Sequence, residues 1–332
     1  MRRRASLAFL AGLAACGTLA GSAGGAAVPS ALFVVFQSDY TPGLSSAAAF
    51  IVIPTASTTL AAASVAVYVP SGYTLDLGLP VGTQIGALVT TESADSGDLT
   101  VADPTAFEND PCAPGPHAAV WTAKLPISGQ QVIVPLFVDP TTADEAARGA
   151  YRITYCQSQL VVVDLEKVLT SPAAPGIYVW RGFVTPAFPS TAPPDPNSVY
   201  ELRALVPLPN SLRIKAAHVT SSKKLVLTGK ATAGTGPEAN ATVGVDQVSG
   251  SRVATFAIAT TRADGTFTIR KTVGETKAAR TLHLTAGAIV PPAPCADPPL
   301  APAGCLEQTV SPSSETTFGA RIPKLPARPP KR

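Results

Sequence analysis

The clearest strand signal in this chain lies in the segment Ala118-Ala119-Val120-Trp121-Thr122-Ala123-Lys124-Leu125. Small or apolar side chains, Trp121 among them, occupy every second position, and Thr122 and Lys124 lie between them. A period of two is typical of a β-strand with one buried face. We therefore expect a β-sheet whose core contains Trp121.

Short apolar runs separated by turn residues continue on both sides of this segment. They predict further strands at residues 32–36, 48–53, 65–69, 84–89, 131–138, 151–155, 161–169, 177–184 and 200–206. The 33 prolines and 26 glycines favour turns over long helices. We expect a single helical turn, at residues 142–148, and a polar loop at residues 92–98. About ten strands at these intervals predict a β-sandwich over residues 28–207.

A second β-rich region follows a Pro-rich boundary at residues 207–210. Strands are predicted at residues 212–218, 224–230, 241–248, 253–260, 266–273, 281–288 and 306–310, which gives a second sandwich over residues 212–318. Its segments Leu227-Thr228-Gly229-Lys230, Ala239-Asn240-Ala241-Thr242-Val243 and Arg262-Ala263-Asp264-Gly265-Thr266-Phe267 resemble those of bacterial Ig-like and carboxypeptidase-regulatory-like modules. The resemblance implies a seven-stranded Ig-like fold and no particular activity. We expect Asp264-Gly265 to form a tight hairpin turn and Phe267 to enter the core.

The first 27 residues have the order of an export signal. Three arginines at positions 2–4 precede an uncharged apolar run at residues 5–15, and small residues follow. Leu13-Ala14-Ala15-Cys16 resembles the bacterial lipobox, which implies a lipid on Cys16; the alternative is ordinary cleavage after Gly25-Ala26-Ala27. Both routes predict an exported protein, extracellular or at the cell surface, and lipid-anchored only in the first case. The apolar run is shorter than the roughly 20 residues of a membrane-spanning helix, and no later segment reaches that length.

Four cysteines lie beyond the signal, at positions 112, 156, 295 and 305. An even number in an exported chain predicts two disulfides, and four cysteines allow three pairings. We favour Cys112–Cys156 and Cys295–Cys305, because each pair then lies within one predicted domain. The absence of a Cys-x-x-Cys motif and the scattered histidines argue against a metal site. No cofactor is expected.

The charge of the chain is nearly balanced. Residues 28–320 contain 17 Lys and Arg against 22 Asp and Glu, which gives the folded body no bulk attraction for nucleic acid. The tail at residues 319–332 is basic and rich in proline, and we expect it to be extended and disordered. Two interpretations of the tail remain open, a solvated chain end and a segment that attracts anionic cell-wall polymer or phospholipid.

Candidate functional residues are few. Tyr178 and Trp180 share one face of the strand at residues 177–184, where they form a stacking platform for a sugar if that face is exposed and part of the core if the strand is central. His117 lies in a loop before the strand that contains Trp121. The acidic residues between positions 92 and 110 could bind Ca²⁺ or line a hydrolase cleft together with His117, and solvated turn residues explain them equally well.

The sequence contains no Gly-x-Ser-x-Gly, His-Glu-x-x-His or phosphate-loop motif. The leading hypothesis is an exported, non-enzymatic protein of structural, adhesive or ligand-presenting type, with cell-wall polymer or glycan as the partner. On this hypothesis the protein binds no nucleic acid and meets the membrane only through a lipid on Cys16. The alternatives are a carbohydrate-binding module that uses Tyr178 and Trp180 and an extracellular hydrolase with an unrecognised site.

Overall fold

The computed structural model describes residues 30–37, 45–55, 62–90, 96–127, 130–156, 161–186, 196–220, 224–249, 252–272, 280–287, 295, 299–310 and 315–320. The predicted export signal with Cys16, and residues 321–332 of the predicted tail, lie outside the described residues. Within them the chain consists of β-strands, turns and three short 3₁₀ segments, η2 (Pro104–Phe107), η3 (Ala143–Glu145) and η4 (Pro196–Ser198). The prediction of an all-β chain is confirmed.

The chain divides into two compact units. The first, here called the first domain, runs to Leu208 and also includes Val290–Ser311; the second domain comprises Pro209–Ile289 and the chain from Pro312 onward. Residues 209–289 of the second domain are therefore inserted between two strands of the first, and residues 312–320 follow the later of these strands, so that the two domains alternate along the chain. The sequence predicts two successive domains instead, with residues 306–310 in the second, and this prediction is wrong for that segment.

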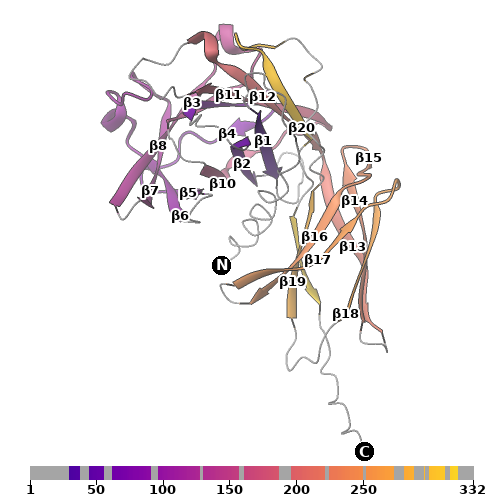
Figure 1. Cartoon of the computed structure of the whole chain (residues 1–332). Helices are drawn as coiled ribbons and strands as arrows, with labels where there is room; N and C mark the ends of the chain where they lie inside the picture. The colour runs from indigo at the N-terminus through magenta and orange to yellow at the C-terminus, as the bar shows by residue number, and fades with distance from the viewer. Residues whose placement is uncertain are drawn as a thin grey trace, which may run out of the picture. The chain divides into compact units, whose positions relative to one another are not determined.

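The first domain is built on one continuous sheet (Figure 1). The strand order is β1-β2-β10-β5-β6-β7-β8-β9-β3-β11-β12-β20, and β4 pairs with β10. The strands are β1 (Ser30–Gln37), β2 (Ser45–Thr55), β3 (Ala62–Val69), β4 (Thr74–Leu75), β5 (Gln84–Thr90), β6 (Ser96–Ala102), β7 (Ala119–Ile127), β8 (Gln130–Pro140), β9 (Tyr151–Tyr155), β10 (Val161–Thr170), β11 (Gly176–Pro186), β12 (Tyr200–Leu208) and β20 (Cys305–Val310). All of these pairings are antiparallel except that of β12 with β20.

The sheet curls around a single core. β1, at one end of the strand order, contacts both β12 and β20 at the other end. The core takes alternate side chains from the strands, as the period-two pattern predicts, and Trp121 is 1% exposed. A cluster of aromatic rings occupies the interior, with Trp180 close to Phe50 and Tyr73.

The second domain is a sandwich of two four-stranded sheets. One sheet contains β13 (Asn210–Val219), β14 (Lys224–Ala233), β15 (Gly236–Pro237) and β18 (Thr266–Thr272); the other contains β16 (Thr242–Ser249), β17 (Arg252–Thr260), β19 (Arg280–Gly287) and β21 (Glu315–Ala320). Phe267 is 1% exposed, as expected. It packs against Gly229, where an added Cβ would overlap both the Phe267 ring and the Arg213 carbonyl oxygen. A close approach of this kind requires glycine.

The turn at Asp264-Gly265 is present but does not form a hairpin. The Gly265 N–H donates to the Arg262 carbonyl, and Gly265 has a φ of 77°. The strands on its two sides, β17 and β18, belong to different sheets. The turn therefore carries the chain from one sheet of the sandwich to the other.

Two further expectations about elements are corrected. The segment expected as a polar loop ends inside β6, which begins at Ser96. β21 extends to Ala320, so that the first residues of the predicted tail form a strand. No helix among the described residues is long and apolar enough to span a membrane.

Candidate functional site

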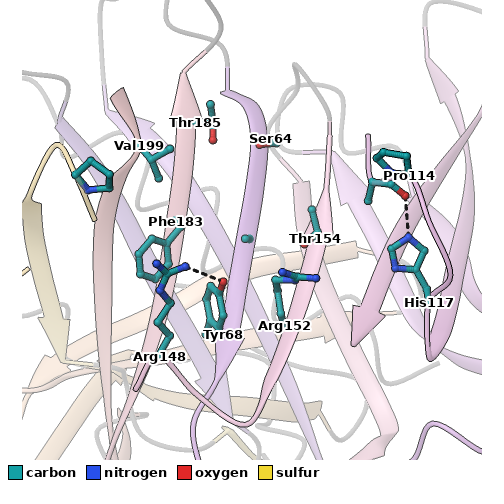
Figure 2. Close-up of a pocket in the computed structure, with 13 residues that line it drawn as sticks. Ser64, Tyr68, Pro114, His117, Arg148, Arg152, Thr154, Phe183, Thr185 and Val199 are labelled. Atoms are coloured by element: carbon teal, nitrogen blue, oxygen red, sulfur yellow. Dashed lines mark hydrogen bonds between the residues drawn. The ribbon is translucent and has the colours of Figure 1, made fainter. Parts of the chain in front are cut away.

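A cavity of about 460 Å³ lies on the face of the first-domain sheet opposite the core (Figure 2). Val65 and Val67 of β3 point into the core, so the alternate residues of this strand face outward and form the cavity floor. We call this cavity the outer-face pocket. It is lined by Ser64, Ala66, Tyr68, Ala113, Pro114, His117, Arg148, Arg152, Thr154, Phe183, Thr185, Val199 and Pro302.

Two disulfide-linked loops form opposite parts of the pocket wall. Ala113 and Pro114 follow Cys112, which is bonded to Cys156. Pro302 belongs to the loop that the Cys295–Cys305 disulfide closes. Both predicted pairings are confirmed, although both disulfides belong to the first domain. Two disulfides are typical of an oxidising compartment.

The second of these loops is bound to the sheet by a buried charge. Glu201 of β12 is fully buried and accepts hydrogen bonds from the Leu300 backbone N–H at 2.9 Å and from Arg203 Nε at 2.8 Å. Arg181 donates a third. Burial alone raises the pKa of Glu201, but these donors outweigh it and hold the pKa below its ordinary value. The pocket wall is thereby held against the sheet.

Tyr68, Glu145 and Arg152 form a hydrogen-bonded group beside the pocket. Glu145 Oε1 accepts from the Tyr68 hydroxyl at 2.7 Å and from the Arg152 guanidinium at 2.9 Å. Burial raises the pKa of Glu145, yet the Tyr68 hydrogen bond and the Arg152 charge leave it below the ordinary value. Burial, and then the bond to Glu145, raise the pKa of the Tyr68 hydroxyl. Glu145 is therefore ionised, and its carboxylate already has hydrogen-bond donors in Tyr68 and Arg152.

Arg148 differs from Arg152 because its charge has no carboxylate partner. It donates one N–H to the Tyr68 hydroxyl oxygen at 3.2 Å, and its guanidinium lies 4.7 Å from the centre of the Phe183 ring (Figure 2). No ion pair links Arg148 to any residue that the structure describes. An arginine stacked on an aromatic ring keeps its planar set of donors in a fixed orientation.

His117 lines the same pocket, but both of its ring nitrogens contact acceptors. Nδ1 lies 3.0 Å from Asp139 Oδ2, and Nε2 lies 2.8 Å from the Ala113 carbonyl oxygen. A neutral imidazole has one N–H, whereas the doubly protonated ring donates to both oxygens. His117 therefore ties the loop after Cys112 to β8, and neither nitrogen is directed at a nucleophile.

Among the acidic residues proposed to accompany His117, those that the structure describes do not line the pocket. Glu92 and Asp95 lie outside the described residues. Asp98 accepts from Gln84 Nε2 at 2.5 Å, Asp103 accepts from the backbone N–H of Thr105 at 3.1 Å at the start of η2, and the Cys112 N–H donates to Asp110. These carboxylates stabilise local turns and pairings. Among the described residues, no group of three His, Cys, Asp or Glu is arranged to hold a metal ion.

The proposed sugar platform is wrong. Trp180 is fully buried and packs against Tyr73, with ring centres 5.2 Å apart, while Tyr178 packs against the edge of the core and donates its hydroxyl to the Ala174 carbonyl. β11 pairs with β3 on one side and β12 on the other, so it is a central strand. The face of β11 that is open carries Phe183 instead. The period of two puts Phe183 and Tyr178 on opposite faces, but it does not tell which face lies outside.

A second surface feature lies on the outer face of β13, β14 and β18. Leu225 and Leu227 of β14 point into the core, so Lys224 and Lys230 point outward at the two ends of the strand, about 20 Å apart. Arg213 is the cross-strand partner of Lys230, and Arg270 lies on the adjacent strand β18. We call these four cations, with the threonines between them, the basic face.

One carboxylate lies close to the basic face. Two hydrogen bonds from Thr266, and more weakly the charge of Lys230, hold the pKa of Asp264 below its ordinary value. The two domains also differ in overall charge. Residues 209–289 and 312–320 contain 11 Lys and Arg against five Asp and Glu, whereas residues 28–208 and 290–311 contain six against 17. The net charge of the whole chain does not reveal this difference between the two domains.

Comparison with known proteins gives no family. No family model matches the chain, and no curated protein matches it. Among solved structures it is similar to a tetra-tandem repeat from the extending region of a large adhesion protein, with 12% identity, 87% of this chain and 74% of that chain covered, and a TM-score of 0.19. It is also similar to the glycoside hydrolase domain of Endo-D from Streptococcus pneumoniae R6, with 8% identity, 87% of this chain and 33% of that chain covered, and a TM-score of 0.18. TM-scores this low support no argument about function.

Proposed function

We propose that this chain is an exported, non-catalytic protein of the cell envelope or extracellular space that adheres to an anionic cell-wall polysaccharide through its basic face. The observation that carries the proposal is the set of four outward cations, Arg213, Lys224, Lys230 and Arg270, on one sheet. Repulsion between like charges on one face is relieved when a polyanion lies across it. The threonines between the cations supply hydroxyl groups for hydrogen bonds to sugar.

Export is part of the proposal and is supported by the signal-like residues 1–27 and by the disulfides. We propose an Ig-like fold for the second domain, supported by its two packed four-stranded sheets. The basic tail beyond Ala320 extends the same charge along the chain and adds to the attraction. The natural partner in this proposal is cell-wall polysaccharide and not nucleic acid, because an exported protein meets the wall.

Binding of the purified mature protein to isolated cell walls tests the proposal. Each cation near an anionic surface contributes about 1 kcal/mol, so the double variant Lys224→Gln/Arg270→Gln is expected to bind roughly 30-fold more weakly. The matched control is Lys124→Gln/Lys167→Gln, which removes two exposed cations from the first domain and should bind as the unaltered protein does. Equal weakening in both variants would mean that net charge alone acts, and would contradict a specific face.

The mature N-terminus decides how the protein is held in the envelope. Lipidation is expected to give a chain that begins at a diacylglyceryl-modified Cys16, whereas ordinary cleavage gives a chain that begins at Val28. Intact-mass measurement of protein isolated from its native host distinguishes these outcomes. A chain that retains Met1 would contradict export by either route.

A further inference from the structure

We infer that the outer-face pocket is a binding site for a small sugar acid, whose carboxylate is held by Arg148. This site lies in the first domain and is independent of the basic face. At about 460 Å³ the pocket falls within the roughly 300–1,000 Å³ of small-molecule sites. It is too small for a polymer but admits one or two sugar units at a chain end.

The charge pattern of the pocket selects an anion. Arg152 is paired with Glu145 and Asp139, at 2.9 and 3.4 Å. Arg148 lines the same pocket with no carboxylate partner among the described residues and with one N–H donated to Tyr68. A guanidinium has five N–H donors, and its planar edge matches a carboxylate bidentately. None of the lining side chains is acidic, and the charge of Glu145 beside the pocket is paired with Arg152.

The overall charge of the first domain makes this contact specific. With six Lys and Arg against 17 Asp and Glu, the domain repels anions at long range. An anion is held there only by a local, oriented cation. Arg148 is oriented by stacking on Phe183 and by its hydrogen bond to the Tyr68 hydroxyl oxygen. The Tyr68 hydroxyl in turn donates a hydrogen bond to Glu145.

The rest of the lining matches a sugar ring better than a simple carboxylate. Thr185 is the cross-strand partner of Ser64, and Thr154 is the partner of Ala66, so three hydroxyl groups lie in adjacent positions along the floor. Val199 and Pro302 supply apolar surface for the C–H groups of a ring, whereas the Phe183 ring is nearly buried beneath Arg148. Hydroxyl groups and apolar surface around one fixed charge are the complement of a hexuronic acid.

Rigid walls favour binding because little of the pocket has to be ordered by the ligand. The loop that carries Pro302 is closed by the Cys295–Cys305 disulfide and bound to Glu201 through the Leu300 N–H. The loop that carries Pro114 is closed by Cys112–Cys156 and held by His117. A preorganised site loses less affinity to conformational entropy.

Isothermal titration calorimetry of the full mature chain tests the inference with four probes: D-glucuronate, D-galacturonate, D-glucose and acetate. We expect saturable binding of at least one uronate, and much weaker binding of glucose and of acetate. Arg148→Gln should weaken uronate binding about 10- to 100-fold, since a charged hydrogen-bonded contact is lost. Arg262→Gln, an exposed arginine in the second domain, should bind as the unaltered protein does.

A second variant guards against a folding defect. Pro302→Glu adds a carboxylate at an exposed position on the pocket wall and leaves Arg148 in place, so uronate binding should fall by a similar factor. Unchanged tryptophan fluorescence checks the fold of each variant. The inference is overturned if neither uronate binds, if glucose binds as tightly as the uronates, if acetate does so, or if folded Arg148→Gln binds uronate normally. None of these results bears on binding of cell walls by the second domain.

Discussion

Glu201 is the residue on which the wall of the outer-face pocket depends most directly. Its fully buried carboxylate accepts from Arg181, Arg203 and the Leu300 N–H. Glu201→Gln leaves two arginines without their counter-charge, and removing one partner from a buried ion pair costs about 3–5 kcal/mol. We expect a loss of this size in the free energy of unfolding, measured by urea denaturation at pH 7. Glu108→Gln, at an exposed position, is the control and should change little.

The same carboxylate makes stability depend on pH. Because the folded state holds the pKa of Glu201 below the ordinary 4.5, the unfolded chain takes up the proton first as the pH falls. The stabilisation is therefore complete above about pH 4.5 and is lost below it, as the folded carboxyl becomes protonated. Glu201→Gln should flatten this part of the stability curve. A variant that loses stability between pH 5 and 3 as steeply as the unaltered protein would contradict this role.

At the scale of single residues, the period-two pattern of the sequence predicts which side chains of a strand are buried. Trp121 is buried as expected, and both disulfide pairings are as predicted, although Cys295–Cys305 lies in the first domain and not in the second. The pocket residues escape prediction because Tyr68, Arg148 and Phe183 meet only through strand pairing and a loop. Glu145 does carry a local signal, the capping-box spacing from Thr142. Its carboxylate accepts from the Thr142 backbone, which is one of the two bonds of that motif, while the Thr142 side chain makes no capping bond. The carboxylate also binds Tyr68 and Arg152.

At the scale of elements, the two disulfide-linked loops should both stabilise the first domain. The cysteines are 44 residues apart in Cys112–Cys156 and 10 apart in Cys295–Cys305. On the chain-entropy model the two bonds contribute about 4 and 3 kcal/mol. Both tryptophans, Trp121 and Trp180, lie in the first domain, so tryptophan fluorescence reports its unfolding alone. Replacing either cysteine pair with alanine should lower the urea midpoint of that signal.

The Cys295–Cys305 pair provides the sharper result. In contiguous domains this bond would stabilise the second domain and leave tryptophan fluorescence unaffected. The pairing of β20 with β12 leads to the opposite expectation. An unchanged fluorescence midpoint in Cys295→Ala/Cys305→Ala would therefore contradict the strand order, whereas the Cys112→Ala/Cys156→Ala variant serves as the positive control.

Strand existence and strand pairing differ in how well sequence reveals them. The apolar alternation at residues 306–310 correctly predicts a strand, β20. It contains nothing that specifies a partner, because residues 209–289 of the second domain separate it from β12 in the sequence. β6 was missed for a different reason, since Gly97 and Asp98 begin a strand with residues typical of turns. A Cβ at Gly97 would overlap the Lys124 carbonyl, so the close approach of β7 explains the glycine.

At the scale of the whole molecule, the inserted second domain means that the first domain is complete only when residues 290–311 are present. A chain ending at Leu208, the natural cut for two successive domains, lacks β20 and the loop over Glu201. It exposes the edge of β12 and leaves the buried charges of Glu201 and Arg203 open to water. Losing about 5 kcal/mol from a domain of this size lowers Tm by at least about 10 °C.

A chain ending at Ala320 keeps every described strand and should unfold as the full chain does. The measurement is the thermal transition of tryptophan fluorescence, which follows the first domain in all three chains. If the chain ending at Leu208 melted at the same temperature as the full chain, β20 would not be an integral strand of the first domain, and the Glu201 and Cys295–Cys305 effects should then vanish with it.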